Sequence, residues 1–189
     1  MNVDEAGCWD RLAQARHGVL ATMHRSRGVD AVPVVFAVVG PGAPWAGPGV
    51  DAGVGADPGG GGAQGRRIVE GGGISEGRRI SEGWRIVVPV DAVKPKRSNR
   101  LQRLVNLESD ARCVLLVDHY EEDWSRLWWV RVHGHGAVSG PEDASEAVVR
   151  LAERYPQYRT PGALVGVITL EPTAMVGWAG GAGDPGSTP

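Results

Sequence analysis

The sequence predicts a mainly β domain of the α+β class, an antiparallel barrel with flanking helices. Strand-like segments follow one another and are joined by turn signals, whereas helix-like segments are few. In chain order we expect a helix, two strands, an insertion, a strand, a helix, two strands, a helix and a strand. Consecutive hairpin-linked strands favour this barrel over a doubly wound parallel sheet. With 189 residues, the chain is long enough for one domain with a substantial core.

The first elements are a helix and a hairpin. Residues 3–16 place apolar side chains at helical spacing, and His17-Gly18 is a suitable helix end. Residues 18–24 and 30–39 are predicted strands separated by a turn. Pro33 lies within the second run and has no backbone N–H. It therefore predicts an edge strand, a bulge or a place where the backbone faces a ligand.

A glycine-rich insertion interrupts this pattern at about residues 40–83. It contains most of the 29 glycines and a short repeat, Ile-Ser-Glu-Gly, which begins at Ile74 and again at Ile80. Ordering so much glycine is costly, and the repeat is too short for a solenoid. We expect a lengthened hairpin loop, disordered or weakly β, without chemistry. Residues 1–179 then form one domain, and residues 180–189 are a predicted disordered tail.

The second half supplies the remaining strands and helices. Strands are predicted at residues 84–91, 111–120 and 127–139, followed by a strand or bent pair at 165–170 and 174–178. Helices are predicted at 98–108 and 141–155, the second starting at a proline. For the first of these helices, the spacing predicts an inward face of Leu101, Leu104 and Val105 and an outward face of Arg97, Arg100 and Arg103.

Charge and cysteine content narrow the class of protein. The net charge is −2, so no overall field favours nucleic acid or anionic lipid. Cys8 and Cys113 lie far apart without a CxxC pair, which indicates a reduced, cytoplasmic setting. No signal peptide is expected, and no apolar run reaches membrane-spanning length. We therefore expect neither a nucleic acid nor a membrane as partner.

A local basic run is the main functional signal. Residues 94–103 carry five cations and no acid, between a predicted strand and a predicted helix. Backbone N–H groups and the positive end of the helix dipole would face an anion there, beside lysine and arginine. This arrangement is typical of a site for a phosphate-bearing cofactor. A solvated helix face is the simpler alternative, and a nucleic-acid arm would need a wider basic surface.

Several segments together resemble a known family. They are residues 18–23, 30–36, the strand followed by 94–97, 110–120 and 128–134, with 118–131 and 153–158 as the most specific. The chain resembles the pyridoxamine 5′-phosphate oxidase-like flavin-binding split barrels, and within them an actinobacterial branch assigned to the deazaflavin coenzyme F420. The resemblance covers roughly residues 5–39 and 84–178. The insertion departs from the family, in which this hairpin is short.

The resemblance implies a homodimeric split β-barrel with the cofactor in a groove between subunits. Such an oxidoreductase would transfer a hydride between reduced F420 and a small organic substrate. The alternatives are an FMN-dependent oxidase or reductase, or a non-catalytic carrier of flavin, deazaflavin or haem. The cofactor supplies the hydride chemistry in this class, so no catalytic side chain is expected to stand out.

The resemblance also implies cofactor-binding positions. The flat ring would lie against the backbone near Val34 and Val35, after Pro33. An ordinary edge strand is the alternative for this segment. The phosphate would be held by the basic run, and the residues assigned to it are Lys96, Arg97 and Ser98, with Arg100 for phosphate or an oligoglutamate tail.

Tryptophans and an arginine near residue 130 are further candidates. Trp128 and Trp129 must point to opposite faces of one strand, so one can fill the core while the other lines a dimer interface or the cofactor. Arg131 shares a face with Trp129 and would meet an anion across the dimer or form a structural salt bridge.

Histidines give a weaker signal. His133 and His135 lie on one strand face, but no third metal ligand is marked, so no metal site is predicted. His119 is a possible proton donor, although a surface histidine explains it as well. No Ser–His–Asp or Cys–His arrangement is recognisable.

Overall fold

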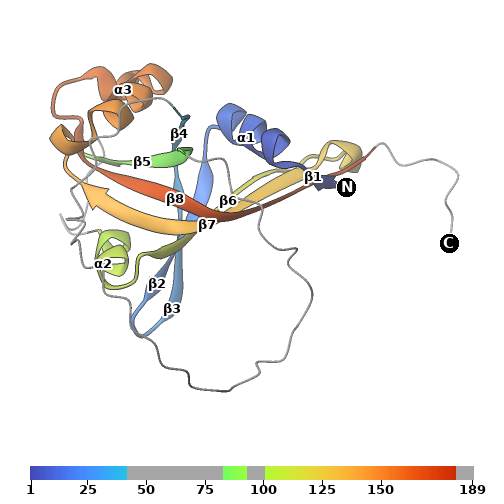
Figure 1. Cartoon of the computed structure of the whole chain (residues 1–189), viewed down its shortest axis with the longest axis horizontal. Coiled ribbons are helices and arrows are strands. Elements are labelled where there is room, and N and C mark those ends of the chain that lie inside the picture. The colour runs from blue at the N-terminus through green and yellow to red at the C-terminus, as the bar shows by residue number, and fades with distance from the viewer. Residues whose placement is uncertain (42–82, 93–100, 182–189) are drawn as a thin grey trace, which may run out of the picture.

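A computed structural model describes residues 1–41, 83–92 and 101–181 of the chain (Figure 1). Its strands are β1 (Asn2–Val3), β2 (Gly18–His24), β3 (Gly28–Val34), β4 (Ala37–Val39), β5 (Arg85–Asp91), β6 (Arg112–His119), β7 (Trp128–Ser139) and β8 (Leu164–Ala179). Its helices are α1 (Glu5–Gln14), α2 (Gln102–Ser109) and α3 (Ser145–Arg154), with the short 3-10 helices η1 (Trp124–Arg126), η2 (Glu142–Ala144) and η3 (Pro156–Arg159).

The strands form one antiparallel sheet that curls into a split barrel. Their order is β3-β2-β6-β7-β8-β5-β4, and β1 adds to β8. The two end strands, β3 and β4, are separated in the chain by Val35 and Phe36 alone. A two-residue link cannot span a flat sheet of this width, so the sheet must curl until its edges approach each other. This confirms the predicted antiparallel barrel with flanking helices.

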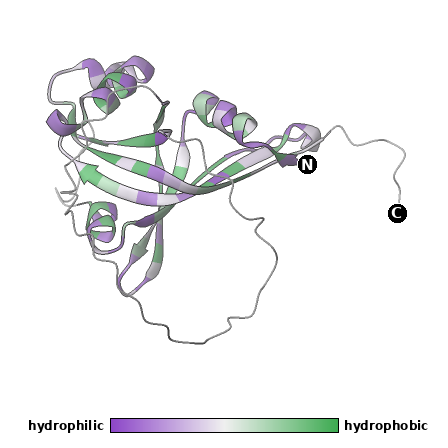
Figure 2. Cartoon of the chain, in the orientation of Figure 1, coloured by the Kyte–Doolittle hydropathy of each residue, from purple (hydrophilic) through white to green (hydrophobic). Residues whose placement is uncertain are grey.

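Alternating side chains fill the barrel. Figure 2 shows hydrophobic and hydrophilic bands that alternate along several strands. On β6, for example, Cys113, Leu115 and Val117 are buried, whereas the residues between them are more exposed. Helix α1 adds Trp9 and Leu12 to this core. A second cluster of buried residues lies under α3 and η3.

One strand prediction is wrong. Residues 30–39 do not form a single strand, because β3 pairs with β2 and β4 pairs with β5 at the opposite edge. The apolar run is continuous in sequence, but the chain leaves one edge at Val34 and joins the other at Ala37. Pro33 lies opposite Val19 on an end strand of the described sheet, as an edge position predicts.

The insertion begins and ends at one hairpin. Val39 of β4 lies opposite Arg85 of β5, so the chain returns beside the point where it left. This agrees with the predicted position in a hairpin. Residues 42–82 lie outside the described part of the chain, as do residues 182–189. The predictions of a disordered insertion and tail are therefore untested.

Two side chains fix the helices to the barrel. The Asn106 amide on α2 donates to Thr22 Oγ1 at 3.0 Å and to Asp30 Oδ2 at 3.1 Å, which ties α2 to the β2–β3 hairpin. The Tyr155 hydroxyl, just after α3, lies 2.7 Å from the Phe36 carbonyl oxygen and accepts from the Phe36 N–H at 3.3 Å. It thereby holds the link between β3 and β4.

Among the described residues, no helix has both the length and the apolar character needed to span a membrane.

Candidate functional site

A pocket of about 340 Å³ lies where the barrel is split. We call it the split pocket, and its lining residues are His17, Pro33, Val34, Val35, Pro89, Asp91, Arg103, Gln157 and Tyr158. They come from β3 and the link after it, from β5, from α2, from η3 and from the turn before β2. The structure thus brings Pro33, Val34 and Val35, three predicted cofactor-binding residues, into one cavity.

The split arises because β4 is short. β4 pairs with β5 only as far as Val87, so β4 does not cover the second half of β5. That half faces the end of β3 across the pocket, and each of these segments carries a proline, Pro89 and Pro33. Proline has no backbone N–H, which suits strand segments that lack a neighbour on one side. The walls that these two segments form carry apolar side chains, namely Pro33, Val34, Val35 and Pro89.

Polar side chains gather at one end of the split pocket. Asp91 ends β5, Arg103 lies on the first turn of α2, and Tyr158 belongs to η3. Burial lowers the pKa of Arg103, and the negative charge of Asp91 opposes this shift. Burial also raises the pKa of Tyr158 to about 12, and Asp91 acts in the same direction. Tyr158 is therefore a stable hydrogen-bond donor and a poor proton acceptor.

The position of Arg103 corrects a prediction. Helical spacing placed this side chain outward, but it is half-buried and lines the split pocket. The side of α2 that appears outward in the sequence faces the end of β5 and η3 across the split pocket. Arg103 Nε is shielded from solvent and has no hydrogen-bond partner among the described residues.

The predicted phosphate-binding residues cannot be placed. Lys96, Arg97, Ser98 and Arg100 all lie outside the described residues. The segment that contains them runs from 93 to 100, between two described residues of the split pocket, Asp91 and Arg103.

Trp129 and Arg131 lie elsewhere. Both are on the outer face of β7, with the Arg131 guanidinium 5.8 Å from the centre of the Trp129 ring. They line a separate hollow of about 310 Å³ with Leu116, Asp118 and Tyr120. Trp128 instead packs against the core, as the alternation of strand faces predicts. Within one chain, Trp129 and Arg131 therefore do not line the split pocket.

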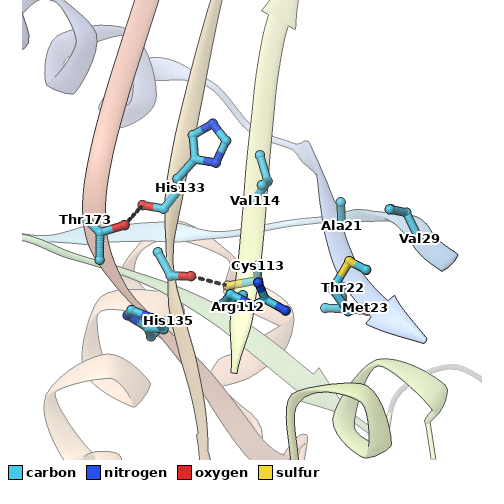
Figure 3. A pocket seen from close by; sticks show the side chains of 11 residues that line it. Ala21, Thr22, Met23, Val29, Arg112, Cys113, Val114, His133, His135 and Thr173 are labelled. Carbon is cyan, nitrogen blue, oxygen red and sulfur yellow. Dashed lines mark hydrogen bonds between the residues drawn. The ribbon is translucent and has the colours of Figure 1, made fainter. Parts of the chain in front are cut away.

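A third hollow, of about 380 Å³, lies on the outer face of the sheet (Figure 3). His133 and His135 of β7 line it, with Met23 and Val29 across the hollow on β2 and β3. Cys113 points the other way, and burial raises the pKa of its thiol to about 12, so it is unreactive. The described residues contain no group of three or more side chains suited to bind a metal.

His119 does not lie in the split pocket either. Its Nε2 is 3.2 Å from Glu121 Oε2 at the exposed end of β6.

The sequence reasoning missed several residues of the split pocket. They are His17, Asp91, Gln157 and Tyr158. Tyr158 and Gln157 belong to the segment 153–158 that carries part of the family resemblance, and Asp91 ends the strand before the basic run. These two segments could have drawn attention to the residues, but the sequence alone does not show that the end of β5 and η3 line one pocket.

Comparison with known proteins supports the fold and not an identity. No protein-family model matches the sequence, and no curated protein is similar to it. The structure is similar to the conserved hypothetical protein Rv2991 from Mycobacterium tuberculosis, with a TM-score of 0.57 and 16% identity over 94% of this chain and 85% of that chain. It is also similar to the FAD binding protein from Mycobacterium smegmatis, with a TM-score of 0.52 and 16% identity over 94% of this chain and 96% of that chain. A protein of unknown function, DIP1874 from Corynebacterium diphtheriae, has a TM-score of 0.52 and 16% identity over 95% and 96% of the two chains. At this identity the similarity establishes a shared fold.

Proposed function

We propose that the protein is an oxidoreductase of the flavin-binding split-barrel type that uses coenzyme F420 and holds its ring in the split pocket. One observation carries the proposal. The cavity that contains the predicted ring-binding backbone, Pro33 to Val35, is also lined by Asp91, which precedes the basic run of residues 94–103, and by Arg103, which ends it. In this proposal, the phosphate of the bound cofactor is held by the basic run, through Lys96, Arg97, Ser98 and Arg100.

The size and lining of the pocket fit a flat ring. A volume of about 340 Å³ is within the usual range for small-molecule sites. Pro33, Val34 and Pro89 offer apolar contact, while Arg103 Nε is a shielded donor with no partner among the described residues. A buried donor of this kind is costly unless a ligand satisfies it.

The protein residues would bind and orient the ring, and the ring would supply hydride transfer to or from a small organic substrate. The backbone of Val34 and Val35 would support one face of the ring. Tyr155 would keep that backbone in place through its bonds to Phe36. Tyr158 would remain protonated, so its hydroxyl would serve as a hydrogen-bond donor.

We also propose a homodimer that pairs the outer faces of two sheets. Large apolar side chains are exposed on this face, namely Met23, Val29, Leu116 and Val176. A sheet face that is apolar and exposed is typical of an interface. Trp129 and Arg131 share this face, so in the dimer they would be available to the cofactor of the partner subunit.

FMN is the nearest alternative cofactor. The shared fold with an FAD binding protein favours a flavin. The segments 118–131 and 153–158, which resemble the F420 branch, favour the deazaflavin.

The first experiment is a titration with F420 and, separately, with FMN, followed by quenching of the fluorescence of the seven tryptophans. We expect saturable quenching by F420. Reversing two charges in Lys96→Glu/Arg97→Glu should weaken binding by about tenfold or more, because a phosphate would then face carboxylates. Arg25→Glu/Arg150→Glu makes the same change in net charge on exposed residues outside the split pocket and should leave affinity unchanged.

Each outcome has a distinct meaning. Preference for FMN would move the protein to the oxidase or reductase alternative. Tight binding of a ring without hydride transfer to any acceptor would indicate a carrier. Binding of neither cofactor would refute the proposed function, and unchanged affinity in the charge-reversed variant would refute the phosphate site.

A further inference from the structure

The polar end of the split pocket contains a carboxylate and a guanidinium, those of Asp91 and Arg103, together with the Tyr158 hydroxyl. Tyr158 donates a hydrogen bond to the Asp91 carboxylate, which fixes the orientation of that carboxylate. Arg103 interacts electrostatically with both Asp91 and Tyr158. The three side chains come from β5, α2 and η3, so three separate elements position them. The remaining polar lining residues, His17 and Gln157, are exposed.

The local charge of this cluster determines what it can bind. Among the described residues of this cluster, Asp91 and Arg103 carry opposite charges, so their two charges compensate each other. A phosphate or carboxylate placed against Arg103 would also meet the Asp91 carboxylate and be repelled by it. A neutral ligand that offers both a donor and an acceptor avoids this conflict.

The cluster offers one acceptor beside one donor. The carboxylate of Asp91 accepts hydrogen bonds, and Arg103 Nε is a shielded donor without a partner among the described residues. The complementary ligand edge has an N–H next to a C=O. Hydrogen bonds in which one partner is charged are roughly twice as strong as neutral ones.

We propose that Asp91 and Arg103 together bind the imide edge of a planar heterocycle, with the carboxylate accepting from the ring N–H and the guanidinium donating to the adjacent C=O. The inference rests on the proposed function, because flavins and deazaflavins both carry this edge on the ring that would lie against Pro33–Val35. Tyr158 is a positioning residue that holds Asp91. The cluster thus selects the shared edge and does not distinguish the two cofactor types.

The test compares ligands that differ only at this edge. Equilibrium binding is measured for FMN and 5-deaza-FMN and for their N3-methyl analogues, which lack the N–H. Wild-type protein should prefer the unmethylated ring by about tenfold or more. Asp91→Asn should reduce this preference to near unity, because Tyr158 would donate to the amide oxygen and leave the NH2 group, a donor, facing the ring N–H. Asp10→Asn, on the exposed side of α1, should leave the preference unchanged.

A second comparison separates ring recognition from phosphate binding. Riboflavin has the same ring edge as FMN and no phosphate. Arg103→Met should weaken riboflavin and FMN by the same factor, about tenfold, if Arg103 binds the ring carbonyl. Tyr158→Phe should lower the preference for the unmethylated ring without abolishing binding.

The outcomes distinguish the inference from the proposed function. Equal binding of methylated and unmethylated rings by the wild type, or an unchanged preference in Asp91→Asn, would overturn the inference and leave the cofactor site intact. If Arg103→Met weakened the binding of FMN but not that of riboflavin, Arg103 would be a phosphate ligand. That result would also overturn the inference. Failure of the wild type to bind any of these rings would overturn the proposed function together with the inference. The wild-type comparison alters only the ligand, so it stands even where a variant does not fold.

Discussion

Asp30 shows how one carboxylate can support a helix that borders the pocket. Its Oδ2 accepts from the Asn106 amide at 3.1 Å and from Arg27 at 3.1 Å. The hydrogen bond from Asn106, followed by that from Arg27, lowers the pKa of Asp30 below its usual 3.8. Asp30 thus helps to fix α2, which carries Arg103, to the β2–β3 hairpin.

This pKa shift predicts a specific acid sensitivity. The unfolded chain binds a proton at Asp30 at a higher pH than the folded chain does. The contribution of Asp30 to stability is therefore present above pH 3.8 and is lost as the pH falls through the lower folded value. Thermal unfolding measured from neutral pH to about pH 3 should show a steeper loss of Tm for wild type than for Asp30→Asn. Parallel curves would contradict this role, and Asp143→Asn, an exposed acid, is the control.

Tyr155 gives a second prediction at this scale. Its buried hydroxyl is bonded to both backbone groups of Phe36, so Tyr155→Phe would leave these groups unsatisfied. We expect a loss of about 1–3 kcal/mol in the free energy of unfolding, measured by denaturant titration. Tyr120→Phe removes the hydroxyl of a side chain that is 71% exposed and should change stability by less than about 0.5 kcal/mol. Equal effects of the two substitutions would contradict the role of Tyr155 in stabilising the link between β3 and β4.

Among the elements, β7 depends on a close approach to β8. The register between the two strands shifts between His133 and Gly134, as at a β-bulge. A methyl group on Gly134 would overlap the backbone carbonyl oxygen of Glu171. Backbone atoms cannot move aside as a flexible side chain can, so this position requires glycine.

Gly134→Ala should therefore be costly. We expect a loss of about 1–3 kcal/mol or more in unfolding free energy, because the strands must separate to admit the methyl group. Gly166→Ala is a matched control on β8, where the added carbon would lie 3.3 Å from the Ser139 carbonyl oxygen. Denaturant titration should show the larger loss for Gly134→Ala, and the reverse order would refute the role of close approach.

The elements also show how far the sequence could predict the structure. The bounds of β2 were predicted correctly, because His17-Gly18 and the turn at 25–28 mark both ends. The division of residues 30–39 into β3 and β4 could not be predicted, since the run is apolar throughout and the change of partner depends on barrel closure. Arg103 was assigned outward for a similar reason, because helical spacing does not show that β5 and η3 form a pocket with that side of α2.

Among the described residues, apolar side chains fill the inside of the barrel, and others are exposed on the outer face of the sheet. Leu116 lies centrally on the outer face, opposite Val19 on β2 and Arg131 on β7. If this face joins two copies, a charge at Leu116 would be buried without a partner. The outer face therefore provides a direct test of the proposed homodimer.

Leu116→Arg should convert the dimer to a monomer, as measured by sedimentation velocity. Val149→Arg places the same charge on the exposed side of α3 and should leave the dimer intact. A monomeric wild type, or a Leu116→Arg variant that remains dimeric, would refute this interface.

The two-residue link between β3 and β4 has a consequence for how the chain can be divided. Residues 1–41 supply strands at both ends of the sheet, β3 with β2 at one end and β4 at the other, while the middle of the sheet comes from residues beyond 83. A gene divided within the insertion would therefore encode two halves of the protein whose strands interleave in the sheet, and neither half contains a complete sheet. Such halves could become native only together, so the fold is suited to serve as a fragment-complementation reporter whose assembly also completes the split pocket.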